Sequence, residues 1–263
     1  MKQFLSSVRE NIAVADGYNL LTFDWPPHVG IKNPLPGQFI TIRNGYSTDP
    51  LLRRPFAVSA FHADSHVCEI VYQIRGSGTR ALSACSKDDK IDIIGPLGNG
   101  FPAPRPGRRV YLVAGGIGFG PIYFLAHSIA KTGNPPVILI GARTKALIPD
   151  VSYDRLLHKG DALVFCTDDG SKGFHGTVVD KLESFENLKP GECEIYACGP
   201  RGMLAGIAKL TEAADITCWV SMEQVMGCGV GACMGCAIRA REPGKYLRVC
   251  TEGPVFNAKD LAW

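Results

Sequence analysis

Four cysteines near the end of the 263-residue chain have a spacing that suits metal chemistry. Cys228, Cys233 and Cys236 form a C-x4-C-x2-C pattern, and Cys250 follows after a gap of thirteen residues. This spacing is typical of plant-type [2Fe–2S] sites, which are held by four cysteine thiolates. The glycines of the loop leave backbone N–H groups free to donate to the sulfur atoms. We therefore predict a [2Fe–2S] cluster on these four thiolates.

Two other interpretations of the cysteines stay open. Structural zinc sites also use four thiolates, but they more often pair two C-x2-C hairpins. Unligated cysteines, in contrast, pack in a core as small hydrophobic side chains. This second interpretation suits the remaining cysteines that lie mostly among apolar strand residues, namely Cys68, Cys85, Cys166, Cys193 and Cys218.

Two turns in the middle of the chain form a second candidate site. One contains Gly115, Gly116 and Gly118 between an apolar run and a helical pattern, and the other is the sequence Cys198-Gly199-Pro200. Such a glycine turn lets a pyrophosphate approach the backbone at a helix N-terminus, and ligands bind at the carboxyl ends of parallel strands. The turn departs from a strict G-x-G-x-x-G, and no clear acid follows about 20 residues later, so an ordinary tight turn is the alternative. Together the two turns predict a nucleotide site.

A third candidate site combines an arginine pair with a later turn. Arg53 and Arg54 precede Phe56, and the turn contains Gly78 and Thr79. The Arg54 guanidinium could make a bidentate pair with a phosphate, while Phe56 could stack on a planar ring. Gly78 and Thr79 could supply N–H and hydroxyl donors to a diphosphate. A solvated arginine pair and an ordinary turn explain the same residues, so both interpretations remain.

The elements that would position these residues fall into three parts. Residues 1–104 contain short strands separated by turn signals, which indicates a small antiparallel barrel. After a proline-rich linker, residues 105–220 alternate apolar strands with helical patterns, which indicates a parallel sheet with crossover helices. Residues 221–263 are too few for a large core, so we expect the metal site to order them. The predicted fold class is a multidomain β + α/β protein.

The composition and the charge pattern exclude several classes of protein. Hydrophobic residues make up 46% and charged residues 20%, which excludes a disordered chain and a coiled coil. A net charge of +3 without a basic stripe predicts no nucleic-acid binding. Residues 110–130 lack charged side chains over a length that could span a bilayer, but their four glycines and Pro121 favour a strand, turn and helix over a membrane span. The first ten residues have no apolar core of signal-peptide length, so we expect a cytoplasmic protein with reduced thiols.

These motifs together resemble those of the ferredoxin–NADP reductase superfamily. That superfamily has a flavin-binding barrel with an R-x-[YF]-[ST] motif and an NAD(P) domain with a Gly-rich turn and a terminal C-G-P. The four-cysteine tail narrows the resemblance to the electron-transfer subunits of class 1B dihydroorotate dehydrogenases. The specific matches are L-L-R-R-P at residues 51–55, T-D-D-G-S at 167–171 and the cysteine motif within 223–236, so that the resemblance covers essentially the whole chain.

The resemblance implies a flavin-binding β-barrel, an NAD-binding α/β domain and a small [2Fe–2S] domain. It implies FAD contacts at Arg54, Pro55, Phe56, Ala57, Val71, Tyr72, Gln73, Gly78 and Thr79, and cluster ligation by Cys228, Cys233, Cys236 and Cys250. The sequence departs from the family motif at Ala57, which replaces a Ser or Thr whose hydroxyl would bond the flavin. Ser59 is a candidate substitute.

The function that the resemblance implies is electron transfer in pyrimidine biosynthesis. Electrons would pass from a catalytic FMN subunit that oxidises dihydroorotate, through the cluster and FAD, to NAD+, with two copies of each subunit in the complex. The electron count agrees, because nicotinamide moves two electrons as hydride, a cluster moves one, and a flavin can do both. No side chain of this chain needs to act as an acid or base.

Two other functions remain as alternatives. One is a reductase subunit of a hydrogenase or ferredoxin:NADP+ transhydrogenase complex, and the other is a zinc-ordered binding module without enzymatic activity. The choice between NAD and NADP is also open, because Arg143 could face either a 2′-phosphate or solvent.

Overall fold

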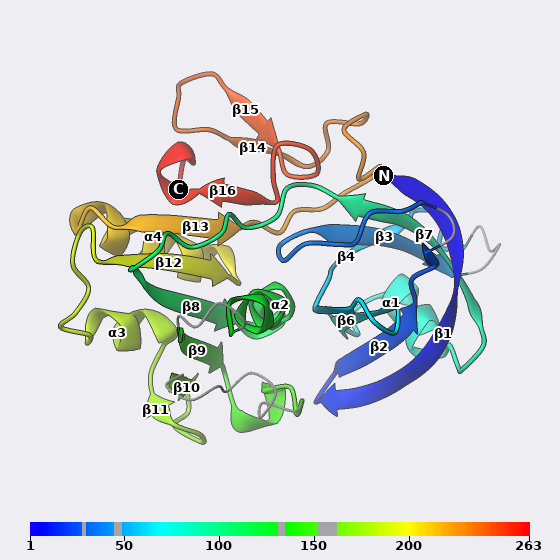
Figure 1. Cartoon of the computed structure of the whole chain (residues 1–263), viewed down its shortest axis with the longest axis horizontal. Coiled ribbons are helices and arrows are strands. Elements are labelled where there is room, and N and C mark those ends of the chain that lie inside the picture. Colours follow the sequence, from blue (N-terminus) through cyan, green and yellow to red (C-terminus); the bar gives the residue numbers. More distant parts are fainter. Residues whose placement is uncertain (28–29, 45–48, 131–134, 152–161) are drawn as a thin grey trace.

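The computed structural model describes residues 1–27, 30–44, 49–130, 135–151 and 162–263. Within these residues the strands form two seven-stranded sheets and one two-stranded sheet. Figure 1 shows the first large sheet curving round on itself at one end of the molecule and the second lying at the other end, with the C-terminal segment along one side of both. This arrangement confirms the predicted β + α/β fold class.

The first sheet is antiparallel and has the strand order β4-β3-β7-β1-β2-β6-β5. Its elements are β1 (Lys2–Ala15), β2 (Tyr18–Asp24), β3 (Phe39–Asn44), β4 (Arg54–Ala57), β5 (Ala60–His62), β6 (Val67–Gln73), α1 (Ser77–Ser83) and β7 (Lys90–Leu97). The sequence alternation explains β6, because Cys68, Ile70 and Tyr72 point into the core of this half-barrel. The edges of the sheet are β4 and β5, and β4 also contacts β6, where the rings of Phe56 and Tyr72 meet.

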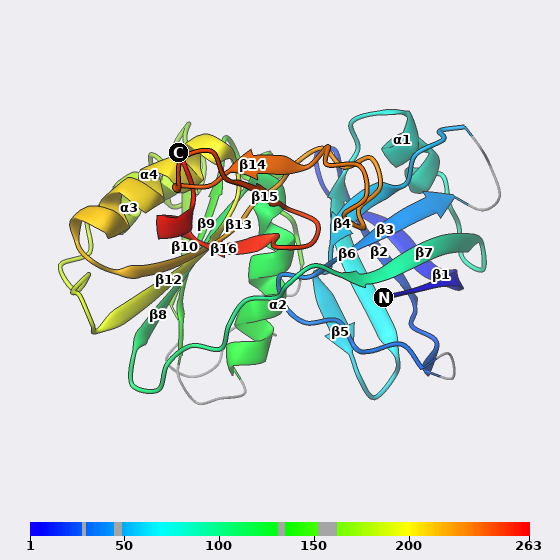
Figure 2. The same cartoon turned by 90° about the horizontal axis from the view of Figure 1, so that it is seen from above.

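The second sheet has the order β11-β10-β9-β8-β12-β13-β16. Its elements and the helices beside them are β8 (Arg109–Gly115), η2 (Gly116–Gly118), α2 (Phe119–Ala130), β9 (Val137–Ala142), η3 (Lys145–Leu147), β10 (Ala162–Thr167), β11 (Phe174–His175), α3 (Val178–Glu183), β12 (Cys193–Cys198), α4 (Arg201–Ala213) and β13 (Thr217–Ser221). The strands from β11 to β13 are parallel. Helix α2 lies between this sheet and the half-barrel, whereas α3 and α4 cover the other face, as Figure 2 shows.

The C-terminal segment is tied to both large sheets. Its elements are β14 (Ala237–Arg239), β15 (Tyr246–Arg248), β16 (Val255–Asn257) and η5 (Ala258–Asp260). Strand β16 pairs antiparallel with β13 and so becomes an edge of the second sheet. On the barrel side, the N–H of Asn99 donates to the carbonyl of Gly253 at 2.6 Å. Residues 221–263, for which the sequence predicts a third domain, are therefore hydrogen-bonded to both large sheets.

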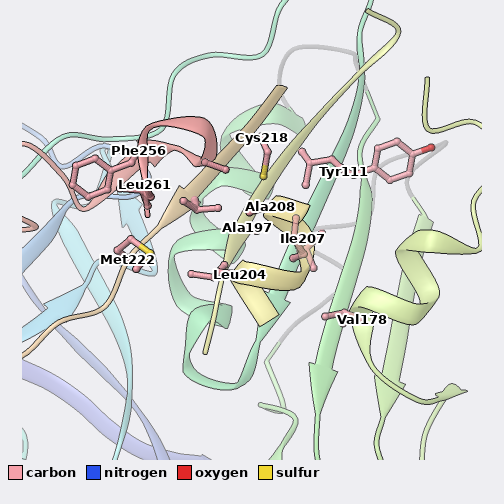
Figure 3. Close-up of a cluster of buried hydrophobic side chains, with 14 of the residues drawn as sticks. Tyr111, Val178, Ala197, Leu204, Ile207, Ala208, Cys218, Met222, Phe256 and Leu261 are labelled. Atoms are coloured by element: carbon pink, nitrogen blue, oxygen red, sulfur yellow. The ribbon is translucent and has the colours of Figure 1, made fainter. Parts of the chain in front are cut away.

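Three clusters of buried apolar side chains connect the half-barrel, the second sheet and the C-terminal segment. The barrel residues Phe39 and Leu97 share a cluster with Cys236 and Cys250 of the C-terminal segment and with the second sheet. Figure 3 shows how Leu204, Ile207 and Ala208 of α4 gather in that cluster with Phe256 and Leu261 of the C-terminal segment. The parts are thus held at fixed positions relative to one another by shared burial.

Residues 110–130 form β8, η2 and α2, which confirms the predicted strand, turn and helix. Among the residues that the structure describes, no helix combines the length and the apolarity needed to cross a bilayer.

Helix α2 offers a test of the contact between the two large sheets. Its side chain Phe124 is 6% exposed and belongs to the core of the half-barrel. We expect Phe124→Ala to lower the free energy of unfolding by about 3–5 kcal/mol, because it removes buried apolar area and leaves a cavity. Phe124→Leu should cost less, since its cavity is smaller. Urea unfolding followed by circular dichroism measures both, and equal, small losses would contradict the packing.

Candidate functional site

The loop that begins at Cys228 surrounds a sulfur atom with backbone donors. The N–H groups of Val230, Ala232 and Cys233 point to the Cys228 Sγ at 3.4, 3.3 and 3.4 Å. Burial alone would raise the pKa of the Cys228 thiol, but hydrogen bonds from Val230, Cys233 and Ala232 outweigh it and lower the pKa to about 6. The N–H of Gly235 donates in the same way to the Cys233 Sγ at 3.5 Å. A thiolate is the form that binds metal, so the loop is prepared for ligation.

The four cysteines lie in two pairs. Cys228 and Cys233 lie together near the surface, where the N–H of Cys233 donates to the Cys228 Sγ at 3.4 Å. Cys236 and Cys250 are 2% and 3% exposed and belong to the same buried cluster. Burial, together with the neighbouring Cys236, raises the pKa of Cys250 to about 11. Two pairs of thiols match two iron atoms that each take two protein ligands.

The donors around these sulfur atoms fit a [2Fe–2S] cluster. Backbone N–H groups that point to the Sγ atoms of Cys228 and Cys233 can stabilise cluster sulfur charge. Ligation by Cys228, Cys233, Cys236 and Cys250 stays a prediction.

Two glycines let the backbone of this loop pack closely against neighbouring side chains. Gly229 and Gly231 have φ values of +70° and +85°, which other residues rarely adopt. A Cβ on Gly229 would lie 2.9 Å from the Cγ2 of Thr41 on β3, and one on Gly231 would lie 2.8 Å from the Cγ2 of Thr251. The cysteine loop therefore packs against β3, the barrel strand that pairs with β4.

The two predicted nucleotide turns meet at one edge of the second sheet. Strands β8 and β12 are neighbours, and Ala114 pairs with Cys198. A Cβ on Gly118 would overlap the carbonyl of Cys198, and one on Gly199 would lie 3.1 Å from the Cα of Gly115. The glycines therefore let the two turns touch backbone to backbone, which is the close packing that a Gly-rich nucleotide turn uses.

Gly116 is the glycine of this turn with free space beside its Cα. It has a φ of +52°, and a Cβ there would meet only the hydroxyl of Tyr18, at 3.7 Å. Beside it, burial raises the pKa of Cys198 to about 12, against a hydrogen bond from Ser221 that lowers it. Cys198 is thus a protonated structural thiol rather than a nucleophile. Pro200 is the exposed N-cap of α4.

The structure brings Arg54 and Gly78 together. A Cβ on Gly78 would lie 2.8 Å from the Nε of Arg54, so the glycine makes room for the guanidinium. Arg54 donates to the carbonyl of Leu52 and, with Gly78, lines a cavity of about 20 Å³. Pro55 pairs with Thr41 across β3 and β4. This placement agrees with a phosphate-binding role for Arg54, which stays a prediction.

Arg53 has a different role from its neighbour. It donates to the carboxylate of Asp92, which is 4% exposed and also accepts from Arg43 at 2.8 Å and from Gln3 at 3.0 Å. A buried carboxylate is stable only when it is paired in this way. The arginine pair is therefore not simply solvated, because Arg53 anchors the segment that presents Arg54. Asp92 was not predicted as part of this site. The only feature of the sequence that points to it is the presence of an acidic residue within an apolar strand.

Three side chains at or near the predicted flavin site make hydrogen bonds to other groups of the protein. Tyr72 is 1% exposed and donates to Asn11 at 2.9 Å, so only its backbone can meet a ligand. The Thr79 hydroxyl accepts from the N–H groups of Arg75 and Gly76 within its own turn. Ser59, the candidate to replace the hydroxyl missing at Ala57, is 1% exposed, and its Oγ accepts from the N–H of Val71 at 2.8 Å. That substitution stays a prediction.

The remaining members of the predicted flavin set keep their places on β4 and β6. The ring of Phe56 lies edge to face with Tyr72 at 5.8 Å, and both Phe56 and Ala57 are half-buried. Gln73 is half-buried at the end of β6, whereas Val71 is buried. The side chains that can still face a ligand here are thus those of Arg54, Phe56 and Gln73.

Tyr18 lies where the barrel meets the second sheet, and no sequence motif indicates it. Burial raises its pKa, and charged side chains act on it from each part: Arg75 of the barrel, Arg143 of the second sheet and Glu223 of the C-terminal segment. Its hydroxyl faces Gly116. Arg143 is exposed beyond the end of β9.

Comparison with known proteins agrees with this architecture. Residues 223–262 match the iron-sulfur cluster binding domain of dihydroorotate dehydrogenase B, and residues 112–209 match an oxidoreductase NAD-binding domain. The dihydroorotate dehydrogenase B (NAD(+)) electron transfer subunit of Desulforamulus reducens is 35% identical over 100% of this chain and 99% of its own length. That of Bacillus caldolyticus is 39% identical over 86% of each chain. A solved NADH-dependent reduced ferredoxin-NADP oxidoreductase has a TM-score of 0.83 at 28% identity, covering 99% of this chain and 90% of the other.

The half-barrel, the NAD-binding sheet and the four-cysteine segment define an oxidoreductase of the ferredoxin–NADP reductase type with an iron–sulfur domain. FAD, a [2Fe–2S] cluster and NAD are the cofactors of this class. The chain belongs to the family of dihydroorotate dehydrogenase B electron transfer subunits.

The cysteine pairs predict a clear metal content. The purified chain should be coloured and contain iron and acid-labile sulfide in equal amounts, in addition to FAD. Cys233→Ser should lose most of the cluster, because one iron loses a ligand. Cys85→Ser is the matched control, since Cys85 is a half-exposed thiol outside the four. Zinc without sulfide, or a full cluster in Cys233→Ser, would contradict the assignment.

The contact between the two glycine turns predicts a separate effect on NAD. Gly118→Ala should lower kcat/KM for NAD+ at least about tenfold, because the added methyl pushes the turns apart. FAD and iron content should not change. Gly206→Ala is the control, since a Cβ there meets Val179 at an ordinary 3.4 Å. Steady-state kinetics distinguishes the two variants, and equal behaviour would show that the turns do not form the NAD site.

Proposed function

We propose that this chain carries electrons from a dihydroorotate-oxidising FMN subunit to NAD+ in pyrimidine biosynthesis, by way of a [2Fe–2S] cluster and FAD. The observation that carries the proposal is the group of four cysteines, because the loop of the first three lies on the barrel strand next to the Arg54–Ala57 strand. The relatives that match along 97–100% of the chain are named as electron transfer subunits of dihydroorotate dehydrogenase B (NAD(+)).

The residues of the chain have binding and positioning roles. Arg54, with Gly78 beneath it, would hold the diphosphate of FAD, and Phe56 would flank its ring system. Gly116 would let the nicotinamide nucleotide approach the backbone at the start of α2. When bound, the flavin exchanges hydride with nicotinamide and single electrons with the cluster, so no acid or base is needed from this chain.

The proposal includes a partner and a location. The relatives are named as subunits, which supports a catalytic partner. The proposed partner contains FMN, and the proposed complex has two copies of each chain. Apolar side chains stand exposed near Cys233, with Val225 82%, Met234 53% and Val230 38% exposed, as a docking surface requires. All ten cysteines are free, which agrees with the reducing cytoplasm.

The proposed domain limits are 1–104 for FAD, 105–220 for NAD and 221–263 for the cluster. The family match to residues 223–262 supports the last limit, while β16 extends the NAD-binding sheet. A second candidate function, as a subunit that links NADH, ferredoxin and NADP, is favoured by the 28% identity to the oxidoreductase of that name.

Co-purification with activity measurement tests the proposal. The tagged chain should retain an FMN protein, and the complex should reduce NAD+ when dihydroorotate is added. The chain alone should not oxidise dihydroorotate. A complex that reduces ferredoxin or NADP+ from NADH, and ignores dihydroorotate, would instead establish the second candidate.

A further inference from the structure

Arg248 connects the two segments that carry the cysteines. Its Nη1 donates to the carbonyl of Gly231 in the loop of the first three cysteines, at 3.2 Å. Its own carbonyl accepts the N–H groups of Thr251 at 3.2 Å and Glu252 at 2.9 Å. Cys250 lies inside the turn that these bonds close. One residue therefore fixes the turn of the fourth cysteine against the loop of the other three.

Glu252 completes this clamp with four further contacts. Its carboxylate accepts from the Arg248 backbone N–H at 2.6 Å and from the Arg248 Nε at 3.1 Å to each oxygen. It also pairs with the Arg248 Nη2. The two side chains are 35% and 36% exposed, so solvent only partly screens them.

The charge of Arg248 lies against both cysteine segments. Its guanidinium bonds the carbonyl of Gly231, between Cys228 and Cys233 in the chain, and its carbonyl closes the turn that contains Cys250. Glu252 offsets this charge by its ion pair with the guanidinium. Lys245 and Glu242 form a comparable ion pair in the same segment, at 2.9 Å, but it is 54% and 68% exposed, and the backbone of Lys245 bonds to Ala240 and Glu242.

We propose that Arg248 and Glu252 are positioning residues of the iron–sulfur site: Arg248 fixes the Cys250 turn on the cysteine loop, and the balance of the two charges sets the reduction potential of the bound cluster. Net charge and hydrogen bonds near the sulfurs are known determinants of that potential. Reduction adds one negative charge, so a nearby cation favours the reduced form and a nearby carboxylate opposes it. The inference rests on the cluster ligation by the four cysteines.

The test is an EPR-monitored redox titration of the FAD- and cluster-loaded protein. Glu252→Gln should raise the cluster potential, because the Arg248 charge is no longer offset. Arg248→Gln should lower it, and the double variant should return close to the wild-type value. Glu242→Gln removes the same charge from the exposed control pair and should leave the potential unchanged.

The positioning role has its own measurement. Arg248→Lys keeps the charge but loses the forked contacts to Glu252 and Gly231, so its potential should stay near wild type. Its cluster should be lost to a chelator about ten times faster, since outer contacts of this kind typically contribute 10–100-fold to metal affinity. If Arg248→Gln loses its cluster before titration, that loss supports the clamp, and Glu252→Gln alone then decides the charge effect.

Several outcomes would overturn the inference. Equal potential shifts in Glu252→Gln and Glu242→Gln would show a general charge effect, and no shift in Glu252→Gln would remove the proposed balance. An unchanged rate of cluster loss in Arg248→Lys would refute the clamp. These results are distinct from a failure of the proposed function, which would appear as a wild-type protein with a normal cluster but no dihydroorotate-dependent reduction of NAD+.

Discussion

The burial of Cys236 and Cys250 is the constraint on which the rest of the structure depends. These thiols share an apolar cluster with Phe39 and Leu97 of the barrel and with the strands of the NAD-binding sheet. Moving them would require opening a core that spans all three parts of the chain. The cluster site, the flavin strands and the nicotinamide turns are therefore held in one fixed relation, which suits electron transfer because its rate depends on distance and not on contact with solvent.

Glycine allows two groups to pack closely at each of the three sites, although the groups differ from site to site. At the cysteine loop, Gly229 and Gly231 let backbone lie against Thr41 and Thr251. At the NAD-binding edge, Gly118 lets two turns touch. At the flavin motif, Gly78 makes room for a guanidinium rather than for backbone. A side chain at any of these positions would separate two groups that are in contact. Glycine is therefore required there by the lack of space and, at Gly229 and Gly231, also by the backbone conformation.

The sequence predicted the features that are local and missed those that depend on distant contacts. Strand periodicity predicted β6 and the buried strands β8 and β12, and cysteine spacing predicted the four thiols, because each signal lies within a few residues. The partners of Asp92 come from three separate segments, and no local pattern indicates them. Ser59 is a candidate substitute for the hydroxyl missing at Ala57 because it is close in sequence. Its bond from the N–H of Val71 on β6 is another contact between separate segments that no local pattern indicates. The residues of the flavin and NAD sites remain predictions that their geometry supports.

Strand β16 gives the C-terminal segment a second task at the edge of the NAD-binding sheet. It follows Cys250 closely in the chain and covers the outer edge of β13. Without it, β13 would present a row of unpaired N–H and C=O groups, and exposed edges of this kind pair with other chains. The segment that brings the fourth cysteine into place therefore also protects the sheet against edge-to-edge aggregation.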